Sequence, residues 1–125
     1  MINGAHFLFY STDPEADRAF LRDKLQFHSV DAGGGWLIFK LPPAEVGVHP
    51  SDGKFVQQHA DHALLSAVLY LMCDDLQATM KSLAVKGVRC SEVTEAEWGV
   101  KTTFALPSGA ELGLYQPLHP TAFDL

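Results

Sequence analysis

The pattern of hydrophobic and polar positions along this chain changes from that of a strand to that of a helix and back to that of strands. The second half of the chain then repeats this order. Residues 5–11, "AHFLFYS", are apolar and aromatic, as in a buried strand. The next segment, "TDPEADRAFLRDKL", places apolar residues at helical spacing with charged residues between them. Thr12 with Glu15, or Asp13 with Pro14 at the first helical position, would cap this helix. Three further strands are expected at 27–32, 36–41 and 44–50.

The second half of the sequence predicts the same order of elements. Residues 64–72 are typical of a strand, and Asp74 or Asp75 then caps a helix that ends at Gly87. A polar stretch without a period, residues 51–63, is interpreted as the connection between the halves. Three more strands are expected at 88–93, 100–106 and 110–117.

Two landmarks recur between the halves. Asp13 and Asp75, which precede the two helices, lie 62 positions apart, whereas Glu45 and Glu111 lie 66 apart. A longer loop at 94–99 accounts for the difference. The sequence therefore predicts a single α+β domain in which two βαβββ modules form a curved mixed sheet around a shared cleft. Its expected parts are the domain 1–125, the modules at about 1–50 and 64–117, and the linker 51–63.

Nearly the whole chain resembles the vicinal oxygen chelate superfamily of glyoxalases, bleomycin-resistance proteins and extradiol dioxygenases. The stretches "HFLFYSTDPEADRAFL", "LYLMCDDLQATMKSLAVKGV" and "TTFALPSGAELGLYQP" carry the resemblance. In enzymes of that family a divalent metal lies in the cleft, bound from the first and fourth strand of each module. The resemblance assigns these positions to His6, Gly47, Val68 and Gly113. Of these, only His6 has a donor side chain, and one imidazole does not make a zinc or iron site.

The residues beside the two glycines would face the same cleft, because alternate residues of a strand share a face. Each glycine has a glutamate two positions before it and a ring-bearing residue two positions after it. These neighbours are Glu45 and His49 around Gly47, and Glu111 and Tyr115 around Gly113.

Several uses of these side chains stay open. His6, Glu45, His49 and Glu111 would form a displaced metal site, or would supply a general base with a partner acid. Aromatic walls from Tyr70, Trp98 and Tyr115 would instead suit a flat or cationic organic molecule. The predicted ligand-binding residues are His6, Glu45, His49, Tyr70, Trp98, Glu111 and Tyr115.

Composition narrows the classes of partner. A net charge of −6 and a pI near 5.3 disfavour nucleic acid, which requires a basic patch. No apolar run approaches the roughly 20 residues of a membrane helix, and no basic segment precedes the first apolar run as in a signal peptide. Cys73 and Cys90 lie in apolar segments, which favours free thiols and a reducing cytoplasm.

The sequence favours a cytoplasmic protein that binds a small organic molecule in the cleft without a cofactor. One alternative is a metal-dependent lyase or extradiol-type dioxygenase that holds a divalent metal at the displaced site. Another is a non-enzymatic interaction protein. The family resemblance and the exposed sheet edges also lead us to expect a homodimer.

Overall fold

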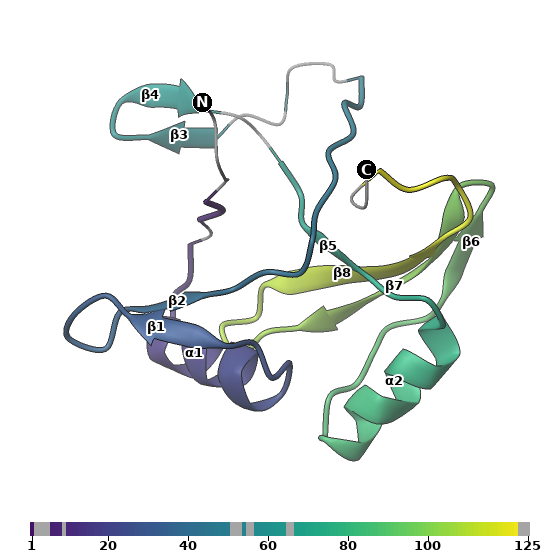
Figure 1. The fold of residues 1–125 in the computed structure, drawn as a ribbon, viewed down its shortest axis with the longest axis horizontal. Coiled ribbons are helices and arrows are strands. Elements are labelled where there is room, and N and C mark those ends of the chain that lie inside the picture. The colour runs from purple at the N-terminus through teal and green to yellow at the C-terminus, as the bar shows by residue number, and fades with distance from the viewer. Residues whose placement is uncertain (2–5, 9, 51–53, 55–56, 65–66, 123–125) are drawn as a thin grey trace.

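The computed structural model describes residues 1, 6–8, 10–50, 54, 57–64 and 67–122. Both helices lie on one side of the main sheet, and the hairpin of two short strands at 57–64 lies apart from it (Figure 1). The elements are α1 (Pro14–Asp23), β1 (Ser29–Asp31), β2 (Leu37–Phe39), β3 (Gln57–His59), β4 (His62–Leu64), β5 (Tyr70–Met72), α2 (Leu76–Val85), β6 (Thr94–Ala96), β7 (Gly99–Ala105) and β8 (Glu111–Pro117).

Both helices begin at an aspartate, which settles the two alternatives left open above. The Asp13 carboxylate accepts from the Ala16 backbone N–H, with Pro14 at the first helical position. Asp75 accepts in the same way from the N–H of Ala78. Gly87 has a φ of +81°, a left-handed conformation that glycine adopts without strain, and it follows the end of α2 as predicted.

The main sheet has four strands in the order β5-β8-β7-β6. β5 pairs with β8 in parallel, and the other pairs are antiparallel, so the sheet is mixed. Together with α2 these strands form one βαβββ module. The predicted α+β class is therefore confirmed.

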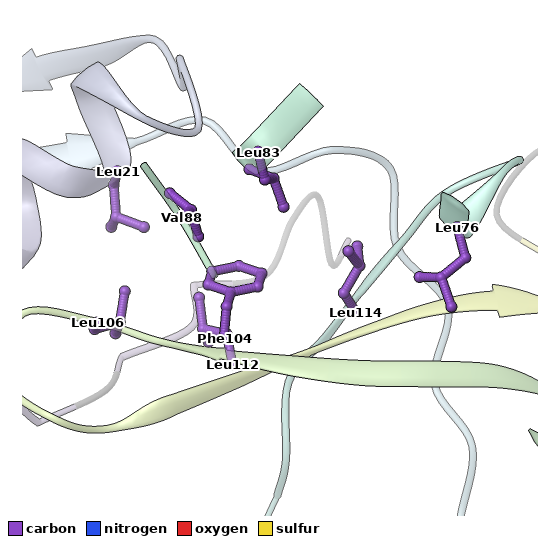
Figure 2. Close-up of a cluster of buried hydrophobic side chains, with 8 residues drawn as sticks. All are labelled: Leu21, Leu76, Leu83, Val88, Phe104, Leu106, Leu112 and Leu114. Carbon is purple, nitrogen blue, oxygen red and sulfur yellow. The ribbon is translucent and has the colours of Figure 1, made fainter. Parts of the chain in front are cut away.

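The hydrophobic core lies between the helices and one face of this sheet (Figure 2). Phe104 is at its centre, and the Phe20 ring of α1 stacks on it at 6.0 Å between centroids. Asp17 of α1 is only 3% exposed and accepts from the backbone N–H and the hydroxyl of Ser108. The buried hydrophobic residues of the core are Leu21, Leu76, Leu83, Val88, Phe104, Leu106, Leu112 and Leu114.

The two helix ends contact each other reciprocally. The Lys24 ammonium donates to the Lys86 carbonyl over 2.9 Å, and the Lys86 ammonium donates to the Lys24 carbonyl over 3.2 Å. A cation at a helix C-terminus interacts favourably with the helix dipole. These lysines are 62 positions apart, like the capping residues Asp13 and Asp75. The repeat found in the sequence thus relates the two helix ends by an approximate two-fold symmetry.

The first half has less strand structure than the sequence predicts. The expected strand at 44–50 is wrong, since none of its residues is in a strand. Pro42, Pro43 and Pro50 donate no backbone hydrogen bond, which disfavours pairing there. For the expected strand at 5–11, the residues 6–8, 10 and 11 are not in a strand, and the other two lie outside the described residues.

The connection predicted at 51–63 contains strand residues that its polar sequence without a period did not indicate. β3 and β4 pair in a hairpin whose two turn residues, Ala60 and Asp61, both have positive φ, at 50° and 65°. Such a two-residue turn matches the twist of paired strands. The module boundaries at about 1–50 and 64–117 remain a prediction.

The strand expected at 88–93, the second of the second half, forms later in the chain than predicted. In 88–93 only Cys90 pairs with the sheet, through an isolated bridge to Phe104. Next to Cys90, the Ser91 hydroxyl accepts a hydrogen bond from the backbone N–H of Thr103 over 2.9 Å. A side chain thus takes the place of a backbone carbonyl as the partner of this N–H. Regular pairing resumes at β6, in the stretch that was expected to be a loop.

Candidate functional site

The face of the main sheet opposite the helices carries the polar and aromatic side chains. Along β8, the buried Leu112 and Leu114 alternate with Gly113 and Tyr115, which belong to this other face. The register of the neighbouring strands β5 and β7 determines which side chains lie beside these two residues. Lys101 of β7 and Met72 of β5 lie opposite Tyr115, and Thr103 and Tyr70 lie opposite Gly113.

Tyr70, Trp98 and Tyr115 form an aromatic cluster on this face. The Tyr70 and Tyr115 rings meet edge to face at 5.5 Å between centroids, and Trp98 meets Tyr115 at 5.7 Å. Edge-to-face pairs are favourable because the positive ring edge meets the negative ring face. Trp98 remains 43% exposed, so the cluster is open to solvent at one end. The sequence named these three residues for a cleft, and the structure brings them together.

Two glycines leave the space that the cluster needs. A Cβ atom on Gly113 would lie 2.2 Å from the Tyr70 ring, and one on Gly99 would lie 2.7 Å from the Gln116 carbonyl oxygen. By contrast, a Cβ on Gly47 would meet nothing within 4 Å. Gly113 is therefore required for the aromatic cluster, although Gly47 occupies the matching position of the first half.

The family's metal does not fit these residues. The resemblance assigns the fourth-strand ligand position of the second half to Gly113, and the Tyr70 ring fills the space that a ligand side chain would need there. The displaced site is not assembled either. Among the described residues, which include His6, Glu45, His49 and Glu111, no three His, Cys, Asp or Glu side chains are placed to hold a metal ion.

Tyr115 is hydrogen-bonded to a residue that the sequence analysis did not single out. Its hydroxyl lies 3.2 Å from His119 Nε2, and His119 Nδ1 lies 2.7 Å from the Pro120 carbonyl oxygen. A carbonyl only accepts, so Nδ1 of a neutral His119 carries the proton, and Tyr115 donates to Nε2. The Tyr115 oxygen thus keeps its lone pairs for a ligand donor.

Burial, together with the negative charge of Glu45, raises the pKa of Tyr115. The phenol is therefore neutral at physiological pH. The Glu45 carboxylate accepts from the backbone N–H of Ala122 over 3.0 Å, which fixes the segment around Glu45 to the C-terminal end of the chain.

Lys101 is the second residue that the sequence analysis missed. Its ammonium lies 5.8 Å from the centroid of the Tyr70 ring and 5.4 Å from that of Trp98. A sequence signal existed: in "GVKTTFA" the buried positions Thr102 and Phe104 alternate with Lys101 and Thr103. The alternation alone does not identify the residues opposite Lys101, since these depend on strand register.

A hollow of about 360 Å³ borders the aromatic cluster at Tyr70. Gly113 and Glu111 contribute to its lining, and the Glu111 carboxylate lies 3.4 Å from the Thr103 hydroxyl, which donates to it. We call this space the sheet hollow. Its volume falls in the range of about 300–1,000 Å³ that small-molecule sites occupy.

A larger cavity of about 560 Å³ lies between the first half and the core. His6 and Trp36 line it among mostly apolar side chains. Of its polar groups, Asp17 is bonded to Ser108, and the Arg18 guanidinium lies over the Trp36 ring at 4.9 Å. We call this space the first-half cavity.

The predicted site residues therefore divide into separate places. The aromatic cluster, Glu45 and Glu111 lie on or beside the open sheet face. His6 lines the first-half cavity instead. His49 is exposed, and its Nδ1 lies 2.7 Å from the Pro50 carbonyl oxygen.

Both cysteines are free and half-buried. Burial raises the pKa of the Cys73 and Cys90 thiols, so neither is a reactive thiolate at neutral pH. Among the described residues, neither of the two helices has the length and apolar character needed to cross a membrane.

No protein-family model and no curated protein matches this chain. Solved structures do match. A lactoylglutathione lyase from Agrobacterium tumefaciens aligns with a TM-score of 0.62 at 14% identity, over 91% of this chain and 92% of its own. TnmS3, an antibiotic-binding protein from Streptomyces sp. CB03234, aligns with a TM-score of 0.56 at 22% identity, over 94% and 98%. UcmS2 aligns with a TM-score of 0.58 at 18% identity, over 92% and 98%. At these identities the likeness establishes the fold.

Proposed function

The chain has the vicinal oxygen chelate fold, and we propose that it uses the open face of its main sheet to bind a small, flat organic molecule. Because one fold serves many activities, the fold does not identify the function, and the proposal rests on the residues of the site. The observation that carries it is the aromatic cluster of Tyr70, Trp98 and Tyr115, held beside the sheet hollow.

The arrangement of the cluster supports binding of an aromatic compound. Three rings in contact form a rigid wall, and a flat ligand gains both apolar burial and ring contacts against it. The half-exposed Trp98 leaves an approach from solvent. Hydrogen bonds from the ligand to the Thr103 and Tyr115 hydroxyl oxygens would orient the ligand.

The solved relatives give the proposal a precedent. TnmS3 is described as an antibiotic-binding protein, so one protein of this fold binds a small organic compound. We infer the same class of activity for this chain, with the compound itself left to experiment. The metal-dependent alternative lacks comparable support, since the Tyr70 ring fills the position of one expected ligand.

Thermal stability in the presence of planar aromatic compounds tests the proposal. A compound that binds only the native state raises its stability by about 2.7 kcal/mol at a hundredfold excess over the dissociation constant. Trp98→Ala should weaken each hit about tenfold or more, because the loss of an aromatic contact from a binding site costs over 1 kcal/mol. The matched variant Trp36→Ala alters the first-half cavity and should leave affinity within twofold. Hits that depend on Trp36 and not on Trp98 would contradict the proposal.

We also propose that the protein is a homodimer. Val46 and Val48 are 90% and 96% exposed, in the segment 44–50 that was expected to be a strand. Exposed apolar side chains and uncovered sheet edges are commonly covered in a symmetric pair of identical chains. Light scattering should then give twice the monomer mass of 13.7 kDa. A monomer mass that persists over a tenfold rise in concentration would contradict the dimer.

A further inference from the structure

Lys101 is half-buried and lies on the open sheet face, and among the described residues its ammonium forms no ion pair with a carboxylate. Within the described part of the chain the ion pair is between Arg22 and Asp23, and Lys101 takes part in none. Its ammonium lies 5.8 Å from the centroid of the Tyr70 ring and 5.4 Å from that of the Trp98 ring. A cation over two rings is stabilised by them, but it retains its full charge and its three N–H donors.

Two acidic residues on or beside this face accept hydrogen bonds from other groups. The Glu111 carboxylate accepts from the Thr103 hydroxyl, and the Glu45 carboxylate accepts from the Ala122 N–H. In the strand register, Lys101 is opposite Tyr115, whereas Glu111 is opposite Ala105 at the far end of β7. The positive charge of Lys101 is therefore available to a ligand.

Building on the proposed function, we propose that Lys101 binds an acidic oxygen of the aromatic ligand, such as a sulfonate, carboxylate or phenolate. The ring system of the ligand would lie against the aromatic cluster, and its acidic group would lie beside the Lys101 ammonium. A hydrogen bond between an ammonium and an anionic oxygen is stronger than one between neutral groups. The proposed ligand is therefore anionic, whereas the sequence favoured a flat or cationic molecule.

Two dyes with the same ring framework test this charge preference. Anilinonaphthalene sulfonate carries an anionic group, and N-phenylnaphthylamine lacks it. Both become fluorescent when bound, so titration gives a dissociation constant for each. The native protein should bind the sulfonate more tightly than the neutral dye.

Variants at position 101 then assign the preference to one side chain. Lys101→Met keeps the length and removes the charge, and it should weaken sulfonate binding about tenfold or more. It should leave binding of the neutral dye within twofold, and Lys101→Arg should preserve the preference. Lys81→Met is the control, because it removes an equal charge from the exposed surface of α2. Lys101→Gln serves if the methionine variant fails to fold.

The outcomes separate the two proposals. If both dyes bind with dependence on Trp98 but Lys101→Met affects them equally, or affects neither, the role of Lys101 is wrong and the site stands. A native protein that prefers the neutral dye also contradicts that role. If neither dye depends on Trp98, the proposed function itself fails.

Discussion

Replacing Gly113 with alanine perturbs the aromatic cluster at its base. The added Cβ would lie 2.2 Å from Tyr70 Cδ1 and 2.5 Å from Cε1, whereas ordinary contacts begin near 3.4 Å. The Tyr70 ring must therefore move by more than an ångström, away from its 5.5 Å contact with Tyr115. Overpacking of this kind costs about 1–3 kcal/mol, and losing the ring pair accounts for about 0.5–1.5 kcal/mol of it. We expect Gly113→Ala to lower the free energy of unfolding by about 1–3 kcal/mol.

Urea denaturation measures this effect, and the chain supplies its own control. Gly47→Ala introduces the same methyl group at the matching position of the first half, where it meets nothing within 4 Å. Its change in unfolding free energy reports the general effect of replacing glycine with alanine. In a Tyr70→Ala background, Gly113→Ala should cost no more than this control. Equal effects of Gly113→Ala and Gly47→Ala in the native background would show that the Tyr70 ring does not make position 113 intolerant of a side chain.

Two further predictions concern titratable groups. Burial desolvates the carboxylate of Asp17, but hydrogen bonds from Ser108 and Ser11 outweigh this effect and lower the pKa of Asp17. The ionised carboxylate therefore stabilises the folded protein above the unfolded pKa near 4. This stabilisation is lost as the pH falls through the folded pKa. Asp17→Asn should therefore lower the free energy of unfolding by about 1–3 kcal/mol at pH 7. In denaturation curves below about pH 4, the difference from the native protein should shrink. A difference that stays constant with pH would contradict a stabilising role of the ionised carboxylate. Glu45→Gln removes a negative charge that raises the pKa of Tyr115, so ultraviolet titration should show Tyr115 ionising at lower pH in this variant than in the native protein. An unchanged titration would mean that Glu45 does not act on Tyr115.

Local chemistry made the helices predictable from the sequence. Asp13 with Pro14, and Asp75 alone, act within one turn of chain, and Gly87 does so at the end of α2. The repeat offset of 62 was also readable, and it reappears in the reciprocal contact of Lys24 and Lys86. The helix caps and the helix end at Gly87 depend on no distant partner.

The strands of the first half were less predictable, because pairing depends on distant partners and on groups that compete for them. Residues 44–50 have an alternating pattern like that of β8, yet prolines flank them and no strand forms. In the hairpin, Ala60 and Asp61 adopt positive φ without the glycine that usually signals such a turn.

The candidate site was predictable in part. Its aromatic residues could be named from position in the strands, but Lys101 and His119 join it through register and through the path of the chain after β8. The space that Tyr70 takes over Gly113 is likewise a tertiary effect. The missing ligand at position 113 was visible in the sequence, whereas its replacement by a ring was not.

The two tryptophans of the chain lie in the two competing sites, so fluorescence can locate a ligand directly. In a Trp36→Phe variant all tryptophan emission comes from Trp98, and in Trp98→Phe it comes from Trp36. Bound N-phenylnaphthylamine accepts excitation energy from a nearby tryptophan. The account predicts saturable quenching of Trp98 emission in the first variant and much weaker quenching in the second. Strong quenching of Trp36 with little change at Trp98 would place the ligand in the first-half cavity and contradict the central claim.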